Sequence, residues 1–196
     1  MVITFHHYNS IDSTMDSAKE LAKRGALHMT VVNAQNQIRG RGRLNRVWCS
    51  DTGGLWFTVI LRPIVTPEFA WQINFIASVA LTRTISELLS IDLRVKWPND
   101  LLYFDKKVAG ILSEMESSTE KISYLLVGIG LNVNNTIDID GINAISLKDI
   151  AQKKVDRALL LVEFIQKFEN ELKHYNISPH SNNFHQSNML NSEFNR

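Results

Sequence analysis

The chain has 196 residues, 44% of them hydrophobic, and its 21 Lys and Arg nearly balance its 20 Asp and Glu, for a net charge of +1. This length and apolar content suit one good-sized core, and no apolar run approaches the roughly 20 residues that span a bilayer. The near-neutral balance excludes the strongly basic character that dedicated nucleic-acid-binding domains usually show.

The N-terminal residues, the cysteine and the histidines indicate the cellular location of the protein and whether it holds a metal ion. The first residues lack the charged region and apolar run of a signal peptide. A single cysteine, Cys49, allows no intrachain disulfide and no multi-cysteine metal site, and the six histidines are scattered. We therefore predict a cytoplasmic protein without a protein-based metal site, and we expect Cys49 to be a buried small residue, not a nucleophile.

The first half of the chain predicts three strands and two helices. Ser13 can cap the first helix and Gly25 can end it. The predicted helix over 69–89 carries apolar residues at helical spacing, so its aromatic side chains are expected in the core. In chain order the predicted elements are a strand over 3–8, a helix over 14–24, strands over 30–35 and 55–61, and a helix over 69–89.

The second half predicts further strands and then helices. In order, these are a strand over 92–96, a hairpin of 101–104 and 107–116 turning at 105–106, a strand over 122–133, and helical structure from 146 with an amphipathic helix over 158–175. Hairpins and helices around one sheet indicate an α+β domain with a mixed sheet flanked by helices. We assign this domain to residues 1–175 and treat the Asn- and Ser-rich residues 176–196 as a short tail.

One loop dominates the sequence: Gly40-Arg41-Gly42-Arg43-Leu44-Asn45-Arg46-Val47-Trp48. Glycine lets the backbone approach a ligand closely, arginine supplies a fork of donors for phosphate or carboxylate, and tryptophan offers a flat face for a ring. An Arg/Gly run can also contact nucleic acid, but the positive charge of this chain is concentrated in one place. The loop therefore favours a pocket for a nucleotide-like anion.

Three more loops carry residues suited to the same ligand: 96–100, 107–112 and 128–134. Each follows or interrupts a predicted strand, so all can meet at one face of the sheet. A carboxylate that attacks the α-phosphate of ATP must overcome repulsion between two anions, and fixed cations such as Lys96 and Lys107 relieve it. Asn99 and Asp100 could orient the metal ion or the nucleotide.

These stretches together resemble the biotin–protein ligases over roughly residues 8 to 150. The Arg/Gly loop looks like that family's signature, and Lys96-Trp-Pro-Asn-Asp100, Lys107-Val-Ala-Gly-Ile-Leu112 and Gly128-Ile-Gly-Leu-Asn-Val-Asn134 look like its next three motifs in order. Ser13-Thr14 looks like the start of its biotin-contacting turn. The resemblance implies a fold like the class II aminoacyl-tRNA synthetases and the activity of a biotin–[acetyl-CoA-carboxylase] ligase.

The implied reaction has two steps. Biotin and MgATP give biotinyl-5′-adenylate and pyrophosphate, and a lysine of a biotin carboxyl carrier protein then attacks the adenylate. Lys107 and Arg41 are the implied catalytic residues, and Mg²⁺ is expected to be held mainly by the ATP phosphates. The implied biotin site comprises Ser13, Thr14, Gln37, Gly40, Arg41, Lys107, Gly110 and Leu112. The implied ATP site comprises Arg43, Arg46, Trp48, Lys96, Asn99 and Asn132.

The chain also departs from the family, and other readings stay open. Met15 stands where many relatives carry Asn, and it can pack against an aliphatic chain. We expect no DNA-binding winged helix before residue 1 and no counterpart of the family's small C-terminal β-barrel after Arg196, and therefore a monofunctional ligase; a homodimer stays open. The alternatives are a lipoate–protein ligase, a nucleic-acid-binding module that uses the Arg/Gly loop, and a non-catalytic biotin-binding scaffold.

Overall fold

The computed structural model describes residues 3–137, 143–177 and 179, so most of the predicted tail lies outside the described residues. Within those ranges, no helix is long and apolar enough to cross a membrane. The strands are β1 (Phe5–Ile11), β2 (Thr30–Gln37), β3 (Leu55–Leu61), β4 (Arg94–Lys96), β5 (Asp100–Tyr103), β6 (Lys106–Ser117) and β7 (Ile122–Leu131). The α-helices are α1 (Thr14–Lys23), α2 (Ala70–Leu89), α3 (Leu147–Ala151) and α4 (Arg157–His174), and short 3₁₀ helices are η1 (Arg43–Asn45) and η2 (Pro67–Phe69).

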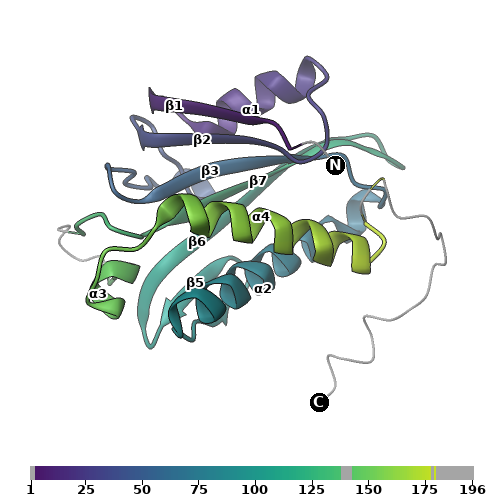
Figure 1. Cartoon of the computed structure of the whole chain (residues 1–196). Coiled ribbons are helices and arrows are strands. Elements are labelled where there is room, and N and C mark those ends of the chain that lie inside the picture. The colour runs from purple at the N-terminus through teal and green to yellow at the C-terminus, as the bar shows by residue number, and fades with distance from the viewer. Residues whose placement is uncertain (1–2, 138–142, 178, 180–196) are drawn as a thin grey trace.

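All seven strands form one mixed sheet in the order β1-β2-β3-β7-β6-β5-β4 (Figure 1). Only the β1–β2 pair is parallel, because α1 connects these two strands as a crossover. The remaining neighbours are antiparallel. The α+β prediction with a mixed sheet flanked by helices is confirmed.

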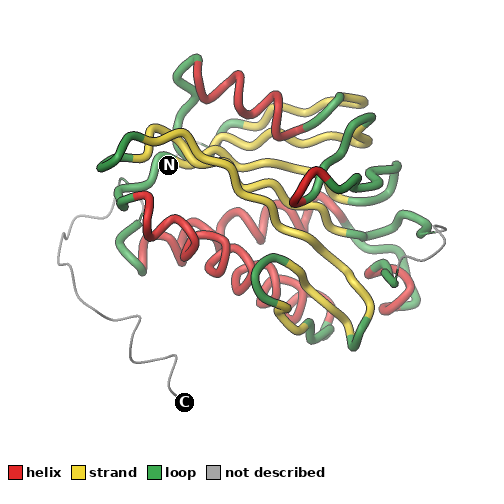
Figure 2. The backbone as a smooth tube through the Cα atoms, turned by 180° about the vertical axis from the view of Figure 1, so that it is seen from behind, coloured by secondary structure: helices red, strands yellow, loops and turns green. Residues whose placement is uncertain are grey.

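Helices cover the two faces of the sheet unequally. Helices α2 and α4 lie side by side on one face, where they enclose the main core (Figure 1). Helix α1 lies on the opposite face of the sheet (Figure 2). There Met15 and Ala18 belong to a smaller hydrophobic cluster. Since successive strand residues point to opposite faces, Val31 belongs to the first cluster and Val32 to the second. The α1 face is left partly uncovered beside α1.

The predicted boundaries are largely confirmed, with three corrections. Helix α2 begins at Ala70, and Phe69 and Trp71 are 45% and 44% exposed, so the expectation that its aromatic residues are core is wrong for these two. The β5–β6 hairpin turns at 104–105, so Lys106 opens β6. The helical C-terminal part divides into α3 and α4, because Gln152 takes a left-handed conformation after α3.

Candidate active site

A cavity of about 580 Å³ lies beside α1 at the end of the sheet where β2 and β7 finish and β3 begins. This volume falls in the range of small-molecule sites, about 300–1,000 Å³. The residues that line it come from α1, from the Arg/Gly loop and from the three other predicted loops. The predicted site residues that line it are Ser13, Thr14, Gln37, Arg41, Arg43, Arg46, Trp48, Asn99, Lys107, Gly110, Leu112 and Asn132.

Two predicted residues do not line this cavity. Lys96 is exposed on β4, and no described residue is seen in hydrogen-bond contact with its side chain, so its role stays a prediction. Gly40 is buried behind the loop, where a Cβ would lie 2.3 Å from the carbonyl oxygen of Trp48. Gly40 therefore serves the folding of the loop, because any side chain would push its two ends apart.

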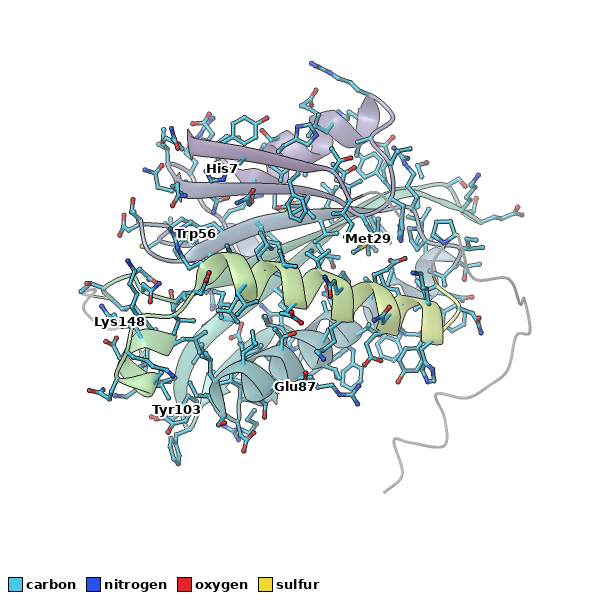
Figure 3. All side chains as sticks on the ribbon, viewed as in Figure 1. His7, Met29, Trp56, Glu87, Tyr103 and Lys148 are labelled. Atoms are coloured by element: carbon cyan, nitrogen blue, oxygen red, sulfur yellow. The ribbon has the colours of Figure 1, made fainter. Side chains whose placement is uncertain are left out.

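Glycines on β6 and β7 leave room for the indole of Trp48. Gly110 and Gly130 are cross-strand neighbours, and a Cβ on them would lie 2.9 Å and 2.5 Å from the Trp48 ring. Trp56, near the beginning of β3 (Figure 3), meets the same ring edge-on with centroids 6.4 Å apart. Gly130 thus allows the close approach of an indole. Gly128 instead makes room for Met15, whose sulfur would lie 2.6 Å from a Cβ there.

Lys107 lies between a carboxylate and an aromatic face. Its Nζ is 2.7 Å from Oδ1 of Asp100 and 4.9 Å from the centroid of the Trp48 ring. Lys107 begins the predicted strand over 107–116, which the structure confirms as part of β6, and its backbone bonds to Asn143 and Ile145. Asp100, a candidate from the sequence for orienting the metal ion or the nucleotide, pairs with this lysine. The ammonium group is therefore held in one place by a carboxylate on one side and by the face of an aromatic ring on the other.

Arg41 is engaged by two carboxylates from different elements. Its Nη1 lies 2.5 Å from Oδ1 of Asp16 on α1, and its Nη2 lies 3.0 Å from Oε1 of Glu114 on β6. Burial alone would lower the pKa of Arg41, but the hydrogen bonds to Asp16 and Glu114 outweigh it and raise that pKa above its usual value. These ion pairs tie the Arg/Gly loop to both walls of the cavity.

A chain of hydrogen bonds runs from the sheet to the loop. Thr58 Oγ1 donates to Thr14 Oγ1 (2.9 Å), and Thr14 donates to Oε1 of Gln37 through Oγ1 (2.9 Å) and through its backbone N–H (2.8 Å). Gln37 Nε2 donates to Ser50 Oγ (2.8 Å), which donates to the carbonyl of Trp48 (3.2 Å). The predicted biotin-site residues Thr14 and Gln37 are thereby linked to the loop that carries Trp48.

Several neighbours of the cavity escaped the sequence analysis. Asp16, Glu114, Ser50 and Thr58 are single polar residues whose partners lie far along the chain, and no local pattern marks them. Cys49 is exposed and lines the cavity, so the expectation that it is buried is wrong. The preference of cysteine for burial is overridden here because the residue lies in an irregular loop beside a hollow.

Comparison with known proteins agrees with this geometry. The sequence pattern of the biotin/lipoate A/B protein ligase family matches residues 8–132. The biotin protein ligase of Aquifex aeolicus, solved in complex with biotin and ATP, superposes with a TM-score of 0.76 at 30% identity, over 88% of this chain and 72% of that one. The chain belongs to the biotin protein ligase family.

Two curated members of the biotin protein ligase family show how much of a longer protein this chain matches. The bifunctional ligase/repressor BirA of Bacillus subtilis is 37% identical over 86% of this chain and 54% of its own length. The biotin–[acetyl-CoA-carboxylase] ligase of Paracoccus denitrificans is 37% identical over 65% of this chain and 53% of its own length. The chain thus spans about half the length of these relatives.

Proposed function

We propose that this protein is an ATP-dependent ligase that converts biotin to biotinyl-5′-adenylate and transfers the biotinyl group to a lysine of a biotin carboxyl carrier protein. The observation that carries the proposal is the convergence of Arg41, Arg43, Arg46 and Lys107 on one cavity. A biotin carboxylate and the ATP phosphates repel one another, and preorganised cations offset that repulsion without reorganisation during the reaction.

Lys107 is the proposed catalytic cation. An ammonium group between the biotin carboxylate and the α-phosphate stabilises the charge that shifts in both half-reactions. Its contacts with Asp100 and Trp48 hold the Nζ in the cavity before ligands arrive. Arg41 is proposed to close the loop over biotin, since it already bridges α1 and β6.

Two groups of residues that line the cavity suit two ligands. Thr14, Gln37 and the apolar Met15 and Leu112 are proposed to contact biotin, with polar groups for its ureido ring and apolar ones for its chain. The adenylate is proposed to lie among Arg43, Arg46, Trp48, Asn99 and Asn132. Arg43 Nη1 donates to the side-chain Oδ1 of Asn99 (3.1 Å), which joins the loop to the β4–β5 turn.

Magnesium is proposed to arrive with ATP. Among the described residues, the carboxylates that line the cavity are those of Asp51 and Asp100, and Asp100 already pairs with Lys107. This donor set suits an ion held mainly by the triphosphate, whose charge such an ion neutralises. The carrier protein, a homodimeric assembly and a cytoplasmic location remain predictions of the same proposal.

ATP–pyrophosphate exchange tests the first half-reaction. We expect exchange that requires biotin and Mg²⁺ and that lipoate does not support. Exchange that lipoate supports equally well would favour a lipoate–protein ligase. The absence of exchange with both biotin and lipoate would favour a non-catalytic biotin-binding scaffold. Transfer is then tested on an isolated carrier domain, with its acceptor lysine changed to arginine as the control. Affinity for nucleic acid that falls steeply with salt concentration would instead support the nucleic-acid-binding module.

A further inference from the structure

Asn135 is a buried polar residue that belongs to none of the predicted motifs. It lies beyond the end of β7, is 5% exposed and lines the cavity together with Asn132. The backbone of Asn132 is fixed on both sides, because its N–H donates to the Val108 carbonyl (2.9 Å) and its carbonyl accepts from the Leu147 N–H (3.0 Å). Only the rotation of the Asn132 side-chain amide is left for another residue to determine.

The hydrogen bonds of Asn135 determine that rotation. A backbone N–H can only donate, so the Val133 N–H requires the carbonyl oxygen of Asn135 as its acceptor (3.0 Å). The Nδ2 of Asn135 must then face Asn132, and it donates to Oδ1 of Asn132 (3.0 Å). Among the described residues, no hydrogen bond is seen from Nδ2 of Asn132. This leaves the NH₂ group as the part of the Asn132 amide that can meet a ligand.

We infer that Asn135 is a positioning residue that keeps Asn132 as a hydrogen-bond donor toward the nucleotide. The inference rests on the proposed function, in which Asn132 contacts ATP. A nucleotide offers acceptors in excess, the phosphate oxygens above all, and a reversed amide would set its carbonyl oxygen against them. Asn135 thus sets which chemical group Asn132 presents without itself needing to touch the ligand.

The test is Asn135→Asp, which is nearly isosteric. One carboxylate oxygen still accepts from the Val133 N–H, but the other can only accept, so the Asn132 amide must turn its NH₂ toward Asp and its oxygen toward the cavity. By calorimetry with saturating biotin, we expect ATP affinity to fall by about 10- to 100-fold. Biotin affinity should stay within about two-fold, because Thr14, Gln37 and Leu112 are untouched.

The added negative charge is separated from the reversed amide by repeating the change in an Asn132→Ala background. If Asn135 acts through Asn132, Asn135→Asp costs little further ATP affinity there; an equal loss in both backgrounds, or no loss in the parent protein, overturns the inference. Asn9→Asp on the exposed face of β1 controls for charge alone.

A folding defect and a failure of the proposed function remain distinguishable. If thermal unfolding shows that Asn135→Asp does not fold, Asn135→Ala replaces it in the same two backgrounds: a few-fold loss confined to the parent supports the inference, and equal or absent losses overturn it. If the parent protein itself binds no ATP with biotin present, the proposed function fails. If the parent binds ATP but the change at Asn135 has the same effect with and without Asn132, only the role of Asn135 is refuted.

Discussion

At the scale of single residues, two of the cations at the cavity are held in position by neighbouring carboxylates. Lys107 is held by Asp100 and the Trp48 ring, and Arg41 is held by Asp16 and Glu114. An unpaired lysine or arginine has many rotamers to lose when a ligand binds. Pairing removes part of that cost in advance, so each cation meets the ligand from a defined position.

Lys107→Ala should slow both half-reactions by about 10²–10³, the usual loss when one preorganised charge is removed. Biotin affinity should fall less, because the ammonium acts more on the transition state than on the ground state. Lys107→Arg should not restore the rates, because a planar guanidinium cannot occupy the same point. Single-turnover rates measure this, and a collapse of biotin affinity with unchanged chemical rates would make Lys107 a binding residue only.

Arg41→Ala should let biotinyl-adenylate leave the enzyme roughly ten-fold faster or more, because the loop loses its charge-assisted bonds to both walls. Glu114→Gln keeps the size of the side chain and removes one partly exposed ion pair, so the dissociation rate should rise only about two- to five-fold. Arg39→Ala, whose ion pair with Asp12 lies outside the cavity, is the matched control. An unchanged dissociation rate in Arg41→Ala would show that the loop is not a lid.

At the scale of elements, the buried pair of His28 and Glu169 joins the segment between α1 and β2 to α4. His28 Nδ1 accepts from the Arg62 backbone N–H (3.1 Å), so its Nε2 carries a proton and faces Oε2 of Glu169 at 3.2 Å. Lys173 lies 3.3 Å from the other oxygen of Glu169. Burial by itself raises the pKa of Glu169, but the bonds from His28 and Lys173 outweigh it and lower that pKa.

Glu169 should therefore make the stability of the fold depend on acid. A carboxyl group with a lowered folded-state pKa stabilises the fold fully above its unfolded pKa of about 4.3, and that contribution is lost as the pH falls through the lower folded value. Glu169→Gln should cost about 1–3 kcal/mol at pH 7 and flatten the decline below pH 5. Urea unfolding from pH 7 to pH 3 measures this, and an identical acid decline in the variant would contradict it.

At the scale of the whole molecule, the Arg/Gly loop connects three parts of the fold. The hydrogen-bond chain from Thr58 through Gln37 reaches the backbone of Trp48, and Arg41 bridges α1 and β6. Trp48, which is proposed to contact the nucleotide, belongs to the same loop that Gln37, a proposed biotin residue, contacts through Ser50. We therefore expect biotin binding to order the residues that contact the nucleotide.

Biotin should accordingly bind first and raise the affinity for ATP. Once biotin has ordered the loop, ATP no longer bears that entropic cost. Calorimetric titration of ATP with and without saturating biotin measures the coupling, and by linkage ATP must raise biotin affinity by the same factor. Equal ATP affinity in both titrations would refute coupling through the loop.

The sequence by itself determined the succession of strands and long helices along the chain and the loops that meet at the cavity. Those features depend on local patterns: the apolar run of β3, the helical spacing of α2, and glycines alternating with arginines. Burial imposes the apolar patterns of β3 and α2 directly, and the Arg/Gly loop is recognised from its composition, so all three are visible without knowledge of the fold. The element boundaries shifted by a few residues because end geometry depends on neighbours.

Only the tertiary structure decided which side chains hold the site. Arg41 and Glu114 are 73 positions apart, and Thr14 and Thr58 are 44 apart. Such pairs form because strand register and the placement of α1 bring distant residues to one end of the sheet, and a shift of one residue in register would turn each strand side chain to the other face. The sequence names the charged and polar residues, but the register of the sheet decides which of them meet.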